Sequence, residues 1–138
     1  MLRSMRKISA LTAILILTAC ATGGDLEALR SHEWKLVSVE GIATLPEGVA
    51  ATPTMQFASD GRLGANTGCN SAGASYTTDG GRLSFGPILS TKRACADPRG
   101  NELEAAVLRA LEATRGYRID TDTLHLLAED GRTLATLR

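Results

Sequence analysis

Aromatic residues, prolines and cysteines are scarce in this chain of 138 residues, and charge of neither sign predominates. It has one Trp, two Tyr, two Phe, four Pro and three Cys, and its 15 basic residues balance 15 acidic ones. Proteins that bind nucleic acid present an excess of basic side chains on one face, which this composition does not offer. With so few aromatic residues, any core must consist mainly of aliphatic side chains.

The sequence also lacks the short motifs of common enzyme and metal sites. It has no His-Glu-x-x-His, no Gly-x-Ser-x-Gly and no glycine-rich phosphate loop before a helix. Its two histidines, His32 and His125, are far apart in the chain and have no neighbouring cysteine, so they do not show the ligand spacing of a zinc site. A Cys–His pair that uses His125 can still form in space, so a hydrolase is a remote alternative. We expect no enzymatic activity, no metal and no cofactor.

Long apolar runs are absent except near the N-terminus, where residues 8–17 form a mostly apolar stretch. A run of this length is too short for a hydrocarbon core, which needs about 20 apolar residues. Three basic side chains precede it: Arg3, Arg6 and Lys7. The run leads into Leu17-Thr18-Ala19-Cys20, which predicts a bacterial lipoprotein signal over residues 1–19 and lipidation of Cys20. An ordinary cleavable signal with a coincidental cysteine, and a short buried helix, are the alternatives.

Lipidation of Cys20 predicts a protein of the cell envelope that is anchored in the membrane. Each buried methylene contributes about 0.8 kcal/mol, so three acyl chains hold a protein on a bilayer essentially permanently. Ala21 occupies the position where an Asp would favour the inner membrane, which indicates the outer membrane, facing the periplasm, if the organism is Gram-negative. Loss of residues 1–19 also removes three of the 15 basic residues, so the remaining chain is mildly acidic.

Turn signals divide the remainder into short segments. Residues 20–30 are small and polar enough to predict a tether, followed by a single domain at 31–138. The strongest signals are Asp60-Gly61, Asp79-Gly80-Gly81 and Asp130-Gly131. Segments with alternating apolar residues surround them, beginning with Glu33–Val39. The pattern predicts an α+β fold with a curled, mostly antiparallel meander sheet that is partly open and barrel-like.

One packed helix is predicted near residues 101–115. Apolar side chains recur there at helical spacing, at Leu103, Ala106, Val107, Ala110, Leu111 and Thr114. Asn101 and Glu104 have the spacing of a capping box, Pro98 precedes the helix, and Gly116 suits the position after its last turn. The apolar stripe implies that this helix covers the core.

Cys69 and Cys95 are the two cysteines left for the folded domain. In an oxidising compartment they favour a disulfide, with buried free thiols or one redox-active cysteine as alternatives. The Cys-x-x-Cys spacing of redox catalysis is absent. Gly68-Cys69-Asn70 predicts a bulged turn fixed by the disulfide. A small-ligand binding module with a pocket near Gly68–Asn70 is the alternative function.

Several motifs occur in a characteristic order between Trp34 and Leu137. They are Trp34-Lys35-Leu36, Phe57 to Gly64, Gly68-Cys69-Asn70, Leu83-Ser84-Phe85, Thr91-Lys92-Arg93-Ala94-Cys95, the helix around Glu104, Tyr117-Arg118-Ile119, Leu124-His125-Leu126 and Asp130-Gly131. Together they resemble the META domain, the HslJ-like family of bacterial envelope proteins. The resemblance implies a small α+β fold, a role in heat-shock or envelope-stress responses, and no general enzymatic activity or cofactor.

From these features we expect a non-enzymatic, lipid-anchored protein that supports envelope integrity. Its expected partners are the membrane, through Cys20, and an envelope protein, without nucleic acid.

Overall fold

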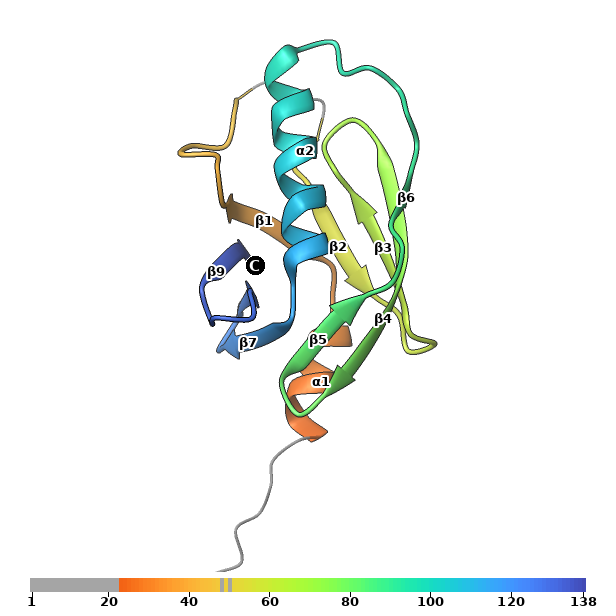
Figure 1. Ribbon diagram of the computed structural model, residues 1–138, viewed down its shortest axis with the longest axis vertical. Helices are drawn as coiled ribbons and strands as arrows, with labels where there is room; N and C mark the ends of the chain where they lie inside the picture. The colour runs from red at the N-terminus through yellow and green to blue at the C-terminus, as the bar shows by residue number, and fades with distance from the viewer. Residues whose placement is uncertain (1–22, 48, 50) are drawn as a thin grey trace, which may run out of the picture.

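The computed structural model describes residues 23–47, 49 and 51–138, so the predicted signal at 1–19 and Cys20 lie outside the described residues. The elements are α1 (Gly23–Arg30), β1 (Trp34–Val39), β2 (Thr54–Phe57), β3 (Arg62–Asn66), β4 (Ser71–Asp79), β5 (Arg82–Phe85), β6 (Leu89–Ser90), α2 (Pro98–Ala113), β7 (Gly116–Asp120), β8 (Thr123–Leu127) and β9 (Thr133–Leu137). Figure 1 shows α2 lying along the strands, with α1 at the opposite end of the domain from the first turn of α2.

The strands form one antiparallel sheet that closes into a barrel. Their order is β3-β2-β1-β9-β8-β7-β5-β4, and β3 also pairs with β4, which closes the ring. The short strand β6 pairs with β4 outside this ring. Closure pairs the strands at the two ends of this order, so their edges are no longer free. The predicted α+β fold with a curled antiparallel sheet and a packed helix is confirmed.

Tight turns join the strands where the sequence predicts them. Asp60-Gly61 joins β2 to β3, Asp79-Gly80-Gly81 joins β4 to β5, and Asp130-Gly131 joins β8 to β9. In the first and third turns the Asp carboxylate accepts a hydrogen bond from the backbone N–H two residues on. Gly61 and Gly131 have φ of +82° and +83°, a conformation that is unstrained only for glycine.

Aliphatic side chains and a few aromatic rings fill the barrel. Burial alternates along β1 until a register shift between Leu36 and Ser38, which returns Val39 to the interior. The largest fully buried side chains are Trp34, Phe57, Leu29, Met55, Leu83, Leu103, Leu111, Leu124, Leu126, Leu137, Val107 and Thr67. Among the described residues, no buried side-chain nitrogen or oxygen lacks a hydrogen-bond partner. The interior is therefore a packed core.

Helix α1 occupies residues for which the sequence predicts a tether. Gly23–Arg30 is helical, and the side chain of Leu29 is fully buried in the core. The carbonyl of Leu29 accepts a hydrogen bond from Trp34 Nε1 at 2.8 Å, and α1 packs against β2 and β7. The fold therefore includes residues that precede residue 31. The small and polar residues of this segment do not predict a helix. The helix is stabilised instead by the contacts that Leu29 makes with the core of the barrel.

Helix α2 begins earlier than residue 101 and has a different cap. The side chain of Asp97 accepts a hydrogen bond from the backbone N–H two residues on, and Pro98 takes the first turn, where no N–H donor is needed. The predicted capping residue Asn101 lies inside the helix, so the capping-box prediction is wrong. At the other end the cap is Thr114, and Gly116 opens β7.

The core-covering role predicted for this helix is confirmed. Its buried residues are Gly100, Leu103, Ala106, Val107, Ala110 and Leu111. They pack against β1, β5, β8 and β9. Neither helix in the described part of the chain has the length and apolar character needed to cross a membrane.

Candidate functional site

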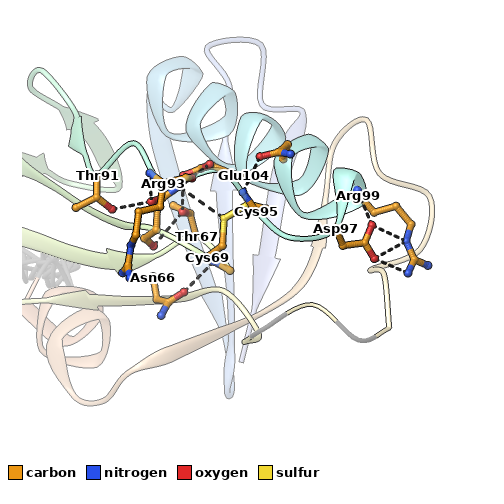
Figure 2. The surroundings of a disulfide bond; sticks show 12 residues. Asn66, Thr67, Cys69, Thr91, Arg93, Cys95, Asp97, Arg99 and Glu104 are labelled. Carbon is orange, nitrogen blue, oxygen red and sulfur yellow. Dashed lines mark hydrogen bonds and ion pairs between the residues drawn. A yellow bond between two sulfur atoms is a disulfide. The ribbon is translucent and has the colours of Figure 1, made fainter.

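Cys69 and Cys95 are joined by a disulfide, with their Cα atoms 5.7 Å apart (Figure 2). Cys69 lies in the turn between β3 and β4, and Cys95 lies in the segment between β6 and α2. That segment has neither helix nor strand from Thr91 to Asp97. The disulfide therefore fixes an irregular part of the chain to the barrel wall.

Asn70 lies beside the disulfide and is 3% exposed. Its Nδ2 donates hydrogen bonds to the carbonyl oxygen of Arg93 at 2.8 Å and to Glu104 Oε2 at 3.0 Å. Its Oδ1 accepts hydrogen bonds from Thr91 Oγ1 at 2.8 Å and from the backbone N–H of Arg93 at 3.0 Å. The two donors and the two lone pairs of this amide are thus all used inside the protein.

Glu104 connects helix α2 to the same cluster. Its Oε1 accepts a hydrogen bond at 3.0 Å from the hydroxyl of Thr67, a residue that is fully buried. We name the Asn70 network as Thr67, Asn70, Thr91, Arg93 and Glu104. It joins the β3–β4 turn, the segment after β6, and α2. The sequence predicted a capping role for Glu104 and assigned none to the two threonines, because their partners are far away in the chain.

The β3–β4 turn depends on the conformation of Gly68. Its φ is +112°, in the region that favours glycine. An added Cβ would still lie 3.6 Å from the carbonyl oxygen of Ala51, an ordinary contact, so backbone conformation rather than space requires glycine here. Asn66 Oδ1 accepts a hydrogen bond from the Gly68 N–H at 2.8 Å. The turn places Cys69 and Asn70 side by side against the segment after β6.

A small hollow lies next to the disulfide. It has a volume of about 140 Å³ and is lined by both cysteines, Gly68 and Gly100, among others. Pockets that bind small molecules are usually about 300–1,000 Å³. A hollow thus exists near Gly68–Asn70, where the alternative function places a pocket, but it is smaller than typical ligand sites.

The structure places the two histidines in other interactions. His125 Nε2 lies 3.4 Å from Asp120 Oδ2, and its Nδ1 lies 3.4 Å from the hydroxyl of Thr136. The ring of His32 packs on that of Trp34, with centroids 4.1 Å apart. Because the two cysteines of the domain are bonded to each other, the described residues do not assemble a Cys–His pair.

Gly100→Ala should lower the free energy of unfolding, because the added Cβ would press on the disulfide. That Cβ would lie 3.0 Å from Cys95 Cβ and 3.3 Å from Cys95 Sγ. The cross-link prevents Cys95 from moving away. Gly→Ala within a helix usually stabilises by about 0.5–1 kcal/mol. Here overpacking should reverse the sign, with a loss of about 1 kcal/mol in urea unfolding.

The matched control for this substitution is Gly64→Ala. An added Cβ at Gly64 would meet nothing within 4 Å. This variant should unfold at close to the wild-type urea concentration. The loss in Gly100→Ala should also shrink once the disulfide is reduced, since Cys95 is then free to move. A stability gain in oxidised Gly100→Ala contradicts the steric explanation.

The cap of α2 should make stability depend on pH in the acid range. The hydrogen bond from the side chain of Arg99 holds the pKa of Asp97 below its ordinary value of 3.8. A carboxyl with a lowered folded-state pKa adds stability above the unfolded-state pKa and loses it as pH falls through the folded-state value. Asp97→Asn should therefore lower Tm at neutral pH and make its decline below pH 3.8 shallower. Thermal melts across this pH range test the prediction, with substitution of the exposed Glu102 by Gln as the control. If Tm of Asp97→Asn declines with acid as steeply as that of wild type, the prediction is contradicted.

Comparison with known proteins shows the family of this chain. The META domain family matches residues 27–138. No curated protein matches the chain. A protein solved by NMR is 22% identical, with a TM-score of 0.63 over 81% of this chain and 92% of that one. A second NMR structure, from Burkholderia xenovorans, is 24% identical, with a TM-score of 0.55 over 99% and 95%.

A crystal structure of a DUF4847 family protein from Bacteroides vulgatus is also similar. It is 18% identical, with a TM-score of 0.54 over 83% of this chain and 96% of that one. At these identities the solved structures support the fold alone. The family match covers most of the chain, including Gly68-Cys69-Asn70, Cys95 and α2. The chain therefore belongs to the META domain family.

Proposed function

We propose that this protein is a non-enzymatic component of the bacterial cell envelope, anchored by acyl chains on Cys20 and acting through contacts with a protein partner. The lipobox Leu17-Thr18-Ala19-Cys20 supports the anchor. In a Gram-negative cell the location that we propose is the outer membrane, facing the periplasm.

The main support for a non-enzymatic role is that the buried polar side chains of the domain form hydrogen bonds with the protein itself. Within the described residues, every buried side-chain nitrogen or oxygen has a hydrogen-bond partner. The side chain of Asn70, in the most distinctive motif, makes all its hydrogen bonds to the protein itself. This supports a structural role for the motif, because a binding or catalytic site needs polar groups directed at its ligand.

Cys20→Ser should release the protein from the membrane. The serine hydroxyl does not take the place of the thiol that receives the lipid, so the acyl chains that hold the protein on the bilayer are lost. Fractionation of cells should find wild type in the membrane pellet, soluble only in detergent, and Cys20→Ser outside it. Mass spectrometry should detect acylation in wild type alone.

The double variant Cys69→Ser/Cys95→Ser is the matched control, because it also loses cysteine sulfur but keeps Cys20. It should remain acylated and in the pellet. Recovery of an acylated, membrane-bound Cys20→Ser protein would contradict the anchor.

Leu89 offers the clearest position at which to look for a partner. It lies on β6, outside the closed barrel, and is 77% exposed, whereas most large apolar side chains of the described domain are buried. A photo-crosslinking residue at Leu89 should give a discrete protein adduct in intact cells. The same residue at exposed Glu112 of α2 serves as the control. Equal labelling from both positions, or none, contradicts a specific contact at β6.

A further inference from the structure

A cluster of metal-binding atom types surrounds the disulfide. Sγ of Cys69, Sγ of Cys95 and a carboxylate oxygen of Glu104 all lie within 4.8 Å of one another, and Figure 2 shows Glu104 next to the bridge. They come from the β3–β4 turn, the segment before α2, and α2 itself. Thiolate sulfur and carboxylate oxygen are both ligands of zinc in proteins.

We propose that the reduced form of this protein binds a divalent cation of the zinc type through Cys69, Cys95 and Glu104. A dithiol reductant supplies two electrons and two protons, the S–S bond breaks, two thiols form, and the reductant becomes a disulfide. Metal binding then displaces both thiol protons, so that two sulfur–metal bonds take the place of the S–S bond. The disulfide and the metal are thus alternative cross-links between the same two segments.

The spacing of the three side chains suits such a site. With metal–sulfur bonds of about 2.3 Å and metal–oxygen bonds of about 2.0–2.2 Å, adjacent ligand atoms around tetrahedral zinc lie roughly 3.5–3.8 Å apart. The two Cα atoms are 5.7 Å apart, so rotation of the cysteine side chains can separate the sulfurs while the backbone stays in place. The Asn70 network already holds the carboxylate of Glu104 beside the two cysteine sulfurs.

Hydrogen bonds that orient the carboxylate ligand are also present, and the same amide lies near one sulfur. Asn70 Nδ2 lies 3.6 Å from Cys69 Sγ and 3.0 Å from Glu104 Oε2, and Thr67 donates to Glu104 Oε1. Each carboxylate oxygen has two lone pairs, so one remains for a metal after each of these hydrogen bonds. Partners of this kind fix the orientation of metal ligands and strengthen binding.

The hollow beside the disulfide gives access to the two sulfur atoms of the cluster. It has a volume of about 140 Å³ and is lined by both cysteines together with Gly68 and Gly100. This is room for a metal ion to enter and for water to complete a four-coordinate site. The absence of a side chain at Gly100 keeps the space next to Cys95 Sγ open.

Cobalt(II) titration tests the site directly. The full chain with Cys20→Ser leaves Cys69 and Cys95 as its only thiols. A phosphine plus water reduces it to two thiols and phosphine oxide without leaving a competing thiol in solution. The reduced protein should develop a sulfur-to-cobalt charge-transfer band that saturates at one equivalent, and zinc should abolish the band. The oxidised protein should show none.

Two substitutions on helix α2 test whether Glu104 is a metal ligand, one at Glu104 itself and one at a matched control position. In the reduced protein, Glu104→Gln should weaken cobalt binding by more than about 10-fold, because loss of an outer-shell partner alone already costs about 10–100-fold and Glu104 is a direct ligand. Glu102→Gln removes an exposed carboxylate of the same helix and should leave the affinity unchanged. Cys69→Ser should abolish the band. Circular dichroism of each reduced variant, with and without metal, shows whether the fold is retained.

Each outcome decides the proposal. A reduced wild-type domain without the band overturns it, whether or not that domain stays folded, because the site then does not form. A band with equal affinity in Glu104→Gln and wild type overturns the three-ligand site and leaves only binding by two thiols. A one-to-one band that Glu104→Gln weakens and Glu102→Gln leaves unchanged supports it.

Discussion

Replacing Cys69 and Cys95 together by serine is expected to lower the free energy of unfolding by roughly 3.5 kcal/mol. The bridge spans 26 positions of sequence, and removing it frees the unfolded chain to adopt conformations that the closed loop excludes. This is a large share of the roughly 5–15 kcal/mol by which a small domain is stable. Urea unfolding under non-reducing conditions measures the loss.

Single substitutions provide the control for this experiment. Cys69→Ser and Cys95→Ser each remove the same bond, so either should destabilise about as much as the pair, and the two losses should not add. Reduced wild type should unfold at close to the midpoint of the double variant. Equal midpoints for oxidised wild type and the double variant, or two thiols that can be alkylated in the non-reduced protein, contradict the cross-link.

Local features of the fold could be predicted from the sequence because their physical causes are local. Asp-Gly turns need a residue that tolerates positive φ, and Gly61 and Gly131 both adopt it. The stripe from Leu103 to Leu111 follows from helical periodicity, and these residues are buried. The fold class follows from turns and stripe together.

Closure of the barrel and the presence of helix α1 could not be predicted from local signals. Closure depends on the pairing of β1 with β9, which joins Leu36 to Leu137 from opposite ends of the domain and so leaves no local signal in the sequence. Helix α1 is stable because Leu29 enters a core formed by residues far along the chain. Both are tertiary effects that override weak local preferences.

The candidate site also has one part that the sequence predicts and another part that it does not. Gly68-Cys69-Asn70 was recognisable as an unusual turn, since glycine and asparagine permit conformations that other residues avoid. Thr67, Thr91 and Glu104 carry no such signal, because an ordinary threonine or helical glutamate is usually solvated. Their roles appear only when the chain brings them to Asn70.

Asn70→Ala is expected to cost about 3 kcal/mol of unfolding free energy, because it removes the amide that joins the three segments of the network. It leaves Glu104 Oε2 and the Arg93 backbone groups without their buried partner. Each buried polar group left unpaired costs about 1–3 kcal/mol, and water can reach some of these at the exposed segment after β6. Asn101→Ala is the matched control. Asn101 is exposed, accepts one hydrogen bond at 3.2 Å, and should lose under about 1 kcal/mol.

Asn70→Asp separates the electrostatic part of this network from its shape. The aspartate keeps the two acceptor contacts but places a carboxylate against Glu104 Oε2, where the amide donated a hydrogen bond. Like charges at this distance raise the folded-state pKa of the pair, so the variant binds more protons when folded than when unfolded. Its stability should therefore fall as pH rises toward neutrality and approach the wild-type value as pH decreases, in urea titrations run in parallel. If Asn70→Asp is as stable as wild type at neutral pH, Glu104 does not depend on the amide donor, and Asn70 is not the centre of this network.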